Sequence, residues 1–349
     1  MIRALFVLLC AMFLSSCDND SRVLLVCGWS DFIPQKLLDD FTQETGVKVM
    51  YEPCESVELI EAKLVSNPGV YDLVIAGAWP GLDRAVNAEL YDKIDWDVVR
   101  YDVFDPGIMT FLQKVDSDNE YFVPYLWGTT GWGYRSDMIA EYYPDAPIDS
   151  LAIIFDPDVL KKLRDCGANV TLLDSPSEVF PALLIYLGYS VNDRNLEHLR
   201  EAADHLRRIY PLISSFDSSL IINDLVSGSN ICSQGWSSSI NMARMLNKNV
   251  KYVSSGIVWI DGFAVPRMAP HRKEAYMFIE FISRAENAAL ATNSTGCANA
   301  VIGSEKFLTD EVRAYANSAF PVSAEIEDTP PAYYHKERMR LWQKIKAGI

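Results

Sequence analysis

Residues 23–51 read VLLVCGWSDFIPQKLLDDFTQETGVKVMY, and the class of fold follows from this stretch. It begins with Val23–Cys27, a short apolar run of the kind that forms a buried parallel strand. Pro34–Thr45 has apolar residues at helical spacing, and Gly46 directly after it is a typical helix terminator. Val47–Tyr51 then predicts a second strand.

The same alternation continues along the chain. Glu55–Val65 predicts a second helix with Leu59, Ile60 and Leu64 on its inner face, and Leu73–Ala76 predicts a third strand. This strand–helix order is typical of a doubly wound α/β sheet, in which ligands bind at the carboxyl ends of the strands. We therefore expect an α/β protein with a ligand site at that edge.

Later segments predict a second domain. A chain of 349 residues exceeds what one hydrophobic core usually serves. Pro124–Gly133 mixes aromatic residues with glycines and predicts a crossover, and Ile257–Val265 predicts a strand that returns to the first domain. The basic segment His335–Ile349 predicts a packed amphipathic helix at the end of the chain.

Composition and motifs exclude several classes of function. The net charge of −16 argues against a nucleic-acid partner, because phosphates would be repelled. The four histidines lack metal-site spacing and no Cys-x-x-Cys occurs, so we expect neither a metal nor a cofactor. Hydrolase motifs such as Gly-x-Ser-x-Gly and His-Glu-x-x-His are missing too. We expect no enzyme, and an exported hydrolase stays an alternative.

The N-terminus has the pattern of an export signal. Arg3 precedes the apolar run Ala4–Leu14, which is too short to span a membrane. The following Ser15-Ser16-Cys17 resembles the bacterial lipobox, in which the cysteine is lipidated and becomes the mature N-terminus. We expect residues 1–17 to be a lipoprotein signal and the mature protein to be lipid-anchored, in the periplasm or on the outer face of the cell membrane. An ordinary signal peptide is the alternative.

Aromatic and acidic residues gather at the predicted strand ends. An ammonium group needs carboxylate acceptors, and such charge-assisted hydrogen bonds contribute about 1.5–3 kcal/mol each. Aromatic faces suit the neighbouring methylenes, and cation–π contacts add about 0.5–2 kcal/mol. These residues therefore predict a box for an organic cation: Trp29, Trp79, Trp236, Trp259, Asp31, Glu178 and Asp261.

The chain also resembles a known family, the bacterial polyamine-binding proteins of ABC importers, over Leu24 to Gly348. The resemblance implies a two-domain periplasmic-binding-protein fold, each domain a doubly wound sheet flanked by helices, with a hinge between them. The resemblance also implies the division into domains. The first domain would consist of residues 22–125 and 256–303, and the second of residues 126–255 and 304–349. The matching segments are Trp29–Phe32, Phe41–Val49, Tyr71–Val74, Pro124–Gly128, Ser177–Phe180, Trp236 and Trp259–Asp261.

The resemblance further implies a monomeric extracytoplasmic receptor. It would bind putrescine or spermidine between its domains, close about the hinge, and deliver the ligand to an ABC permease of the inner membrane. A ferric-iron or other cation receptor is an alternative because Tyr333-Tyr334 is a tyrosine pair, and a sensor or adhesion role is another. The implied ligand-binding set is Trp29, Ser30, Asp31, Phe32, Gly77, Trp79, Ser175, Glu178, Trp236, Ser239, Trp259, Asp261 and Cys297.

Some positions depart from the family pattern. Phe32, Gly77 and Cys297 stand where the family has tyrosine, serine and tyrosine. Ser239 matches spermidine-type members, whereas Ser175 stands where those members have another carboxylate. The preference between putrescine and spermidine therefore stays open.

Five cysteines remain beyond the export signal and the lipid site, so at least one is unpaired. The resemblance implies a disulfide between Cys166 and Cys232. Cys27 and Cys54 lie at the ends of the first two predicted strands, which should be neighbours, so a second bridge is plausible. Cys297 would then be a free thiol near the ligand.

Overall fold

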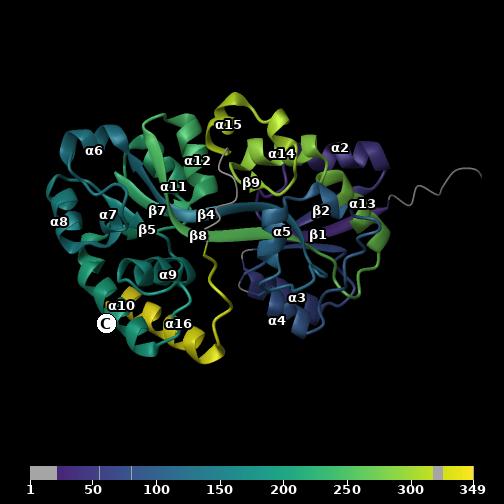
Figure 1. The fold of residues 1–349 in the computed structure, drawn as a ribbon, viewed down its shortest axis with the longest axis horizontal. Coiled ribbons are helices and arrows are strands. Elements are labelled where there is room, and N and C mark those ends of the chain that lie inside the picture. The colour runs from purple at the N-terminus through teal and green to yellow at the C-terminus, as the bar shows by residue number, and fades with distance from the viewer. Residues whose placement is uncertain (1–21, 55, 80, 317–324, 349) are drawn as a thin grey trace, which may run out of the picture.

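A mixed β-sheet runs through the whole molecule and carries helices on both faces (Figure 1). The computed structural model describes residues 22–54, 56–79, 81–316 and 325–348, so the expected signal and Cys17 lie outside the described residues. Within them the strands form one nine-stranded sheet of order β2-β1-β3-β8-β4-β7-β5-β6, with β9 paired to β4. The expected α/β class is confirmed.

The first part of the sheet follows the predicted alternation. Strand β1 (Val23–Trp29) is parallel to both β2 (Lys48–Cys54) and β3 (Leu73–Gly77). Helices α2 (Gln35–Thr45) and α3 (Val57–Ser66) connect these strands. The carboxyl ends of the three strands therefore meet at one edge, where the sequence predicts the ligand site.

Local sequence explains where these helices end and which face they bury. Gly46 adopts the left-handed conformation (φ 71°) and its N–H donates to the Thr42 carbonyl, which ends α2. In α3, Ile60 and Leu64 are buried as expected. Leu59 was expected to point inward but is 42% exposed, because it lies on the solvent face of the amphipathic helix.

Two long strands join the two halves of the sheet. Strands β4 (Val123–Arg135) and β8 (Val250–Ala264) pair antiparallel from Val123–Phe263 to Arg135–Val250. The C-terminal end of β8 pairs with β3, and the C-terminal half of β4 pairs with β7. The two sheets expected from the sequence are therefore joined into one, because β4 and β8 are long enough to serve both.

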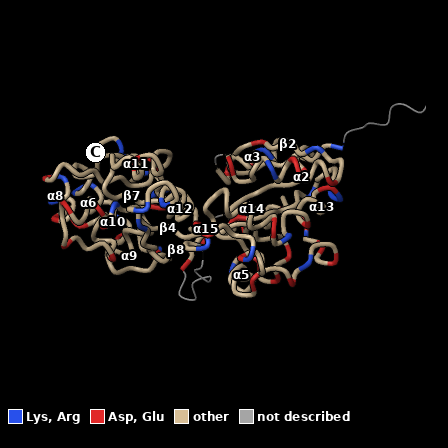
Figure 2. The backbone as a smooth tube through the Cα atoms, turned by 90° about the horizontal axis from the view of Figure 1, so that it is seen from above, with Lys and Arg blue, Asp and Glu red and all other residues tan. Residues whose placement is uncertain are grey.

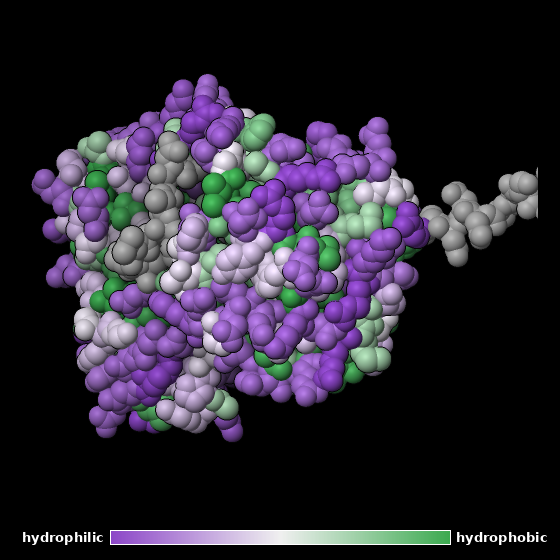
Figure 3. Space-filling model, turned by 45° about the vertical axis from the view of Figure 1, so that its right-hand side comes forward, coloured by the Kyte–Doolittle hydropathy of each residue, from purple (hydrophilic) through white to green (hydrophobic). Residues whose placement is uncertain are grey.

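Buried apolar side chains form two large clusters, one toward each end of the sheet. The first contains Phe41, Phe263 and Phe278, and the second contains Phe180 and Trp342. We call the parts of the chain around them the first lobe and the second lobe, and Figure 2 shows them side by side. Because the apolar side chains fill these clusters, the face drawn in Figure 3 is mostly hydrophilic.

The remaining elements cover the two lobes. In the first lobe lie α4 (Leu82–Asn87), η1 (Tyr101–Val103), α5 (Pro106–Leu112), α13 (Arg272–Ile282), α14 (Ala285–Thr295) and β9 (Ala298–Asn299). Against α14 lie η3 (Ser304–Phe307) and α15 (Asp310–Ala316). In the second lobe lie α6 (Ser136–Tyr142), α7 (Ala152–Phe155), α8 (Pro157–Asp165), β5 (Val170–Leu172), α9 (Pro176–Tyr186), α10 (Leu196–Ile209), η2 (Tyr210–Leu212), β6 (Ser215–Phe216), α11 (Ile221–Ser227), β7 (Cys232–Trp236), α12 (Ser237–Leu246) and α16 (Ala332–Lys346).

The final helix α16 packs into the second lobe, which confirms the prediction of a packed terminal helix. Leu341, Trp342 and Ile345 are buried in the second cluster. The segment before α16 behaves differently, because Ile326 is buried in the first cluster although the expected division assigns it to the second domain. None of the described helices is long and apolar enough to cross a membrane.

The disulfide that the sequence left open is present, and the disulfide that the resemblance implies is not. Cys27 and Cys54 form a disulfide that joins the ends of β1 and β2. Cys166 and Cys232 are both free. Cys166 lies exposed at the end of α8 with its thiol 3.5 Å from the Tyr142 carbonyl, whereas Cys232 is fully buried inside the second lobe. The two thiols therefore face different surroundings and do not meet.

Candidate functional site

The carboxylate of Asp261 is held at the edge where β1 and β3 end. The Trp29 indole N–H at the end of β1 donates to Asp261 Oδ1 over 3.1 Å. Asp261 lies on β8 directly opposite Gly77, the last residue of β3. A Cβ at Gly77 would lie 2.9 Å from the Trp79 carbonyl oxygen and 3.4 Å from Asp261 Oδ1. Glycine therefore leaves room for the carboxylate.

The environment raises the pKa of Asp261 to about 7. Burial contributes most, because it disfavours the charged form, and the negative charge of Glu178 adds to the rise. The hydrogen bond from Trp29 acts in the opposite direction. A carboxylate with this pKa gains from a cationic partner that replaces its lost hydration.

The carboxylate of Glu178 comes from the second lobe. It lies in the first turn of α9, where the helix dipole favours a negative charge. The Thr130 hydroxyl donates to Glu178 Oε2 over 2.8 Å, and the Trp236 indole N–H donates to Oε1 over 3.0 Å. Burial raises the pKa of Glu178, and these two hydrogen bonds oppose the rise.

The two lobes thus present matching groups to each other. Each holds one partly buried carboxylate, Asp261 or Glu178, that accepts from one indole N–H. The negative charge of Glu178 acts on Asp261 across the boundary between the lobes. Two like charges in partly desolvated positions repel, and a dication between them would remove that repulsion.

Three of the expected residues, Ser30, Asp31 and Phe32, directly follow β1. Ser30 and Asp31 are exposed, and Asp31 has a positive φ of 57°, a conformation that aspartate tolerates better than most residues. Its charge, with that of Asp261, adds to the burial that raises the pKa of Tyr51. Phe32 is partly buried and meets the Tyr125 ring edge-on at 6.0 Å between centroids.

Cys297 lies close enough to Asp261 for the charge of that carboxylate to act on it, and its expected contact with ligand stays a prediction. Its side chain is 2% exposed and its thiol is free. Burial raises the pKa of Cys297 to about 12, and the charge of Asp261 adds to the rise. Hydrogen bonds with Thr295 and Ser238 oppose it. The thiol is therefore neutral next to Asp261.

Two further tryptophans supply aromatic surface. Trp79 is buried with its ring 5.8 Å from that of Phe111, and Trp259 is partly buried on β8. The Trp259 ring passes so close to Gly128 that any side chain at that position would collide with it. Neither indole N–H has a hydrogen-bond partner among the described residues.

The two expected serines are partly buried at helix starts. Ser175 is the N-cap residue of α9, and Ser239 lies in the first turn of α12. No described hydrogen bond joins either side chain to Asp261 or Glu178. Their expected contact with ligand stays a prediction.

Sequence reasoning missed Thr130 and Tyr51. Thr130 lies within the crossover segment that the sequence singles out, but nothing in that segment marks its hydroxyl as the partner of Glu178. Tyr51 ends a predicted strand, and its hydroxyl donates to the Trp29 carbonyl over 2.5 Å. Both roles depend on strand register, which sequence periodicity does not reveal.

The tyrosine pair considered as an iron ligand is not part of this site. Tyr334 is 1% exposed and packs in the second cluster, whereas its neighbour Tyr333 is 57% exposed. The described residues contain no group of three or more His, Cys, Asp or Glu side chains placed to hold a metal ion.

Comparison with known proteins shows the family to which the chain belongs. Residues 36–319 match the sequence model of the bacterial extracellular solute-binding proteins. The chain belongs to the bacterial extracellular solute-binding protein family. A putrescine-binding periplasmic protein of Pseudomonas aeruginosa is 32% identical, over 94% of this chain and 93% of that protein. A putrescine-binding periplasmic protein of Escherichia coli is 31% identical, over 97% and 95%.

Solved structures share the fold. A putative spermidine/putrescine ABC transporter protein from Listeria monocytogenes superposes with a TM-score of 0.81 at 25% identity, over 93% of this chain and 99% of that one. The iron-bound protein HitA from Pseudomonas aeruginosa has a TM-score of 0.66 at 15% identity, over 93% of this chain and 99% of that one. The second likeness concerns the fold alone. The expected periplasmic-binding-protein fold is therefore confirmed.

Proposed function

We propose that this solute-binding protein is an extracytoplasmic receptor for a linear polyamine, putrescine or spermidine, and delivers it to an ABC importer. The observation that supports the proposal is the pair of carboxylates, Asp261 from the first lobe and Glu178 from the second, which are close enough for the charge of Glu178 to act on Asp261. The relatives named as putrescine-binding periplasmic proteins support the same ligand class.

The pair suits a diamine better than a single cation. One ammonium group binds the Asp261 carboxylate, the other binds the Glu178 carboxylate, and the methylenes between them pack on tryptophan rings. Trp29 and Trp236 keep each carboxylate in place by donating one indole N–H to it. The remaining lone pairs of both carboxylates then accept from the ligand.

Closure follows from the electrostatics. Without ligand, the two carboxylates repel and favour separation of the lobes. A dication that binds both removes the repulsion and shifts the population toward the closed form. The hinge lies in β4 and β8, near 124–128 and 254–258, between the first and the second lobe. The protein acts as a monomer, anchored to the membrane by lipid on Cys17, and performs no bond chemistry.

Isothermal titration of the mature, unlipidated protein tests the proposal. The protein is first unfolded and refolded to remove bound ligand, and is then titrated with putrescine, spermidine, cadaverine and ferric citrate. We expect one-to-one binding of putrescine or spermidine and no heat with ferric citrate. Absence of heat with all three polyamines would refute the ligand class and leave the fold assignment intact.

A further inference from the structure

A short segment, residues 325–331, crosses from the middle of the sheet to the start of α16 (Figure 1). It begins against β8, where the Val258 N–H donates to the Glu325 carbonyl over 2.9 Å and the Glu325 N–H donates to the Gly256 carbonyl over 3.1 Å. These bonds lie where β8 passes between the lobes. The segment is therefore a third connection beside β4 and β8.

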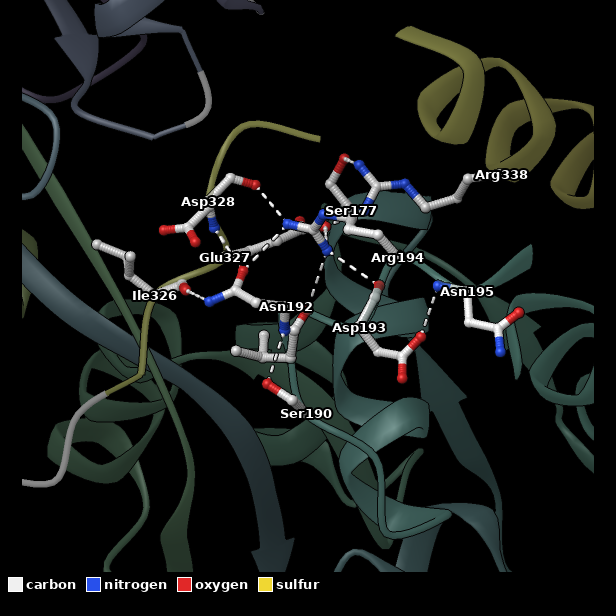
Figure 4. Close-up of polar contacts among 11 residues, drawn as sticks. Ser177, Ser190, Asn192, Asp193, Arg194, Asn195, Ile326, Glu327, Asp328 and Arg338 are labelled. Carbon is white, nitrogen blue, oxygen red and sulfur yellow. Dashed lines mark hydrogen bonds and ion pairs between the residues drawn. The ribbon is translucent and has the colours of Figure 1, made fainter. Parts of the chain in front are cut away.

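The segment is bonded firmly to the second lobe (Figure 4). Asn192 accepts from the Asp328 N–H over 2.7 Å and donates to the Ile326 carbonyl over 2.8 Å. Arg194 donates to the Asp328 carbonyl over 2.7 Å. Both partners lie between α9 and α10. These bonds hold the backbone of the segment to the second lobe, whereas the Ile326 side chain packs in the first cluster. The part that moves with the second lobe therefore begins at Glu327.

A buried arginine connects the segment to the helix that carries Glu178. Arg338 of α16 is 1% exposed and donates to Glu327 of the segment and, over 3.2 Å, to the Ser177 hydroxyl. Ser177 directly precedes Glu178 in the first turn of α9. The positive charge of Arg338 also opposes the rise in the pKa of Glu178. The position of Glu178 is thus fixed relative to the segment.

On its other side the segment contacts the first lobe. The Thr329 hydroxyl donates to Asp83 Oδ1 of α4 over 2.8 Å. The start of α16 faces the same part of the first lobe. Burial lowers the pKa of His335; the charges of Arg338 and Arg84 add to this, whereas that of Glu58 opposes it. Motion of the second lobe away from α3 and α4 would break the Thr329–Asp83 bond.

We propose that residues 327–331 are a latch that engages Asp83 when the lobes close and so couples closure to ligand binding at Glu178. The inference rests on the proposed function, since it needs a ligand that draws Glu178 toward Asp261. The ligand moves α9, Arg338 and the latch together, and the latch then bonds the first lobe. By linkage, breaking the latch lowers ligand affinity because less of the protein is closed.

The test is a double-mutant cycle in the refolded full mature protein with putrescine and spermidine as probes. Thr329→Val removes the hydroxyl donor, and Asp83→Ala removes its acceptor. Loss of one hydrogen bond to a carboxylate predicts roughly three- to tenfold weaker binding, chiefly through faster dissociation. The double variant should be no weaker than either single variant, because both lose the same bond.

Two controls separate the latch from general damage. Asp83→Asn keeps an oxygen acceptor and should retain most of the affinity. Thr309→Val makes the same change directly before α15, where the hydroxyl accepts from the Val312 N–H and has no part in the latch, and it should bind like the wild type. Small-angle scattering with saturating ligand should show a larger mean radius of gyration for Thr329→Val than for the wild type.

The outcomes distinguish the two proposals. Wild-type binding together with unchanged affinity and scattering in Thr329→Val would overturn the latch and leave the receptor function standing. Additive losses in the double variant would also overturn it. Absence of any polyamine binding by the wild type would overturn the receptor function. It would also overturn the proposed coupling between the latch and ligand binding.

Discussion

The charged carboxylate of Asp261 lowers the stability of the ligand-free protein, and the same charge favours binding of an ammonium group. Its pKa is about 7 in the folded protein, against about 3.9 for an unperturbed aspartate, so the folded state binds this proton more tightly. The stabilising contribution is fully present below about pH 4 and is lost as the pH rises through about 7. Above that pH the ligand-free protein carries a partly buried charge.

We therefore expect Asp261→Asn to stabilise the ligand-free protein at pH 8, by on the order of 1–3 kcal/mol, and by much less at pH 4. The same change should weaken polyamine binding tenfold or more, because a charge-assisted bond is lost. Urea unfolding at both pH values and titration with putrescine measure the two effects. The exposed Asp165→Asn is the matched control. An equal stability change at both pH values would contradict the assignment of the pKa.

Trp29 affords a second test at this scale, since its indole N–H and its ring have separable roles. Trp29→Phe keeps an aromatic face and removes the donor to Asp261. Loss of the donor raises the pKa of Asp261 further, because the hydrogen bond favours the charged form. We expect weaker binding at pH 7 and a pH profile of affinity shifted to higher pH. A profile that stays in place would show that the indole N–H does not act on Asp261.

At the scale of elements, the disulfide between Cys27 and Cys54 fixes the ends of β1 and β2 beneath the ligand site. It closes a loop with a sequence separation of 27 residues. In the chain-entropy description such a loop stabilises by about 3–4 kcal/mol. We expect the double variant Cys27→Ala/Cys54→Ala to lose stability of that order in urea unfolding under oxidising conditions. Cys166→Ser, at an exposed free thiol, should change stability little.

Elements were more predictable than contacts. The spacing of apolar residues in 23–76 indicates which segments are strands and which are helices. The sequence alone therefore predicts β1, α2, β2, α3 and β3. The bond between Trp29 and Asp261 joins residues 232 positions apart and depends on β8 returning beside β3. No local pattern encodes that register. A resemblance to relatives supplied Asp261 as a ligand residue, and the same kind of reasoning failed for Cys166.

At the scale of the whole molecule, the facing carboxylates predict that closure depends on pH. Burial raises the pKa of both Glu178 and Asp261. At pH 8 Asp261 is charged, so its repulsion with the negative charge of Glu178 is strongest and a dication gains most by bridging the two carboxylates. At pH 5 Asp261 is protonated, which weakens both the repulsion between the lobes and the attraction for an ammonium group.

We expect the polyamine affinity to fall by up to about 100-fold between pH 8 and pH 5, since pH 5 lies about two units below the pKa of Asp261. The decrease in radius of gyration on adding ligand should also be larger at pH 8, because the ligand-free protein is then more open. Titration calorimetry and small-angle scattering at both pH values measure these changes. In Asp261→Asn both quantities should vary less with pH. A wild-type affinity that stays constant from pH 8 to pH 5 would mean that Asp261 does not bind the ammonium group.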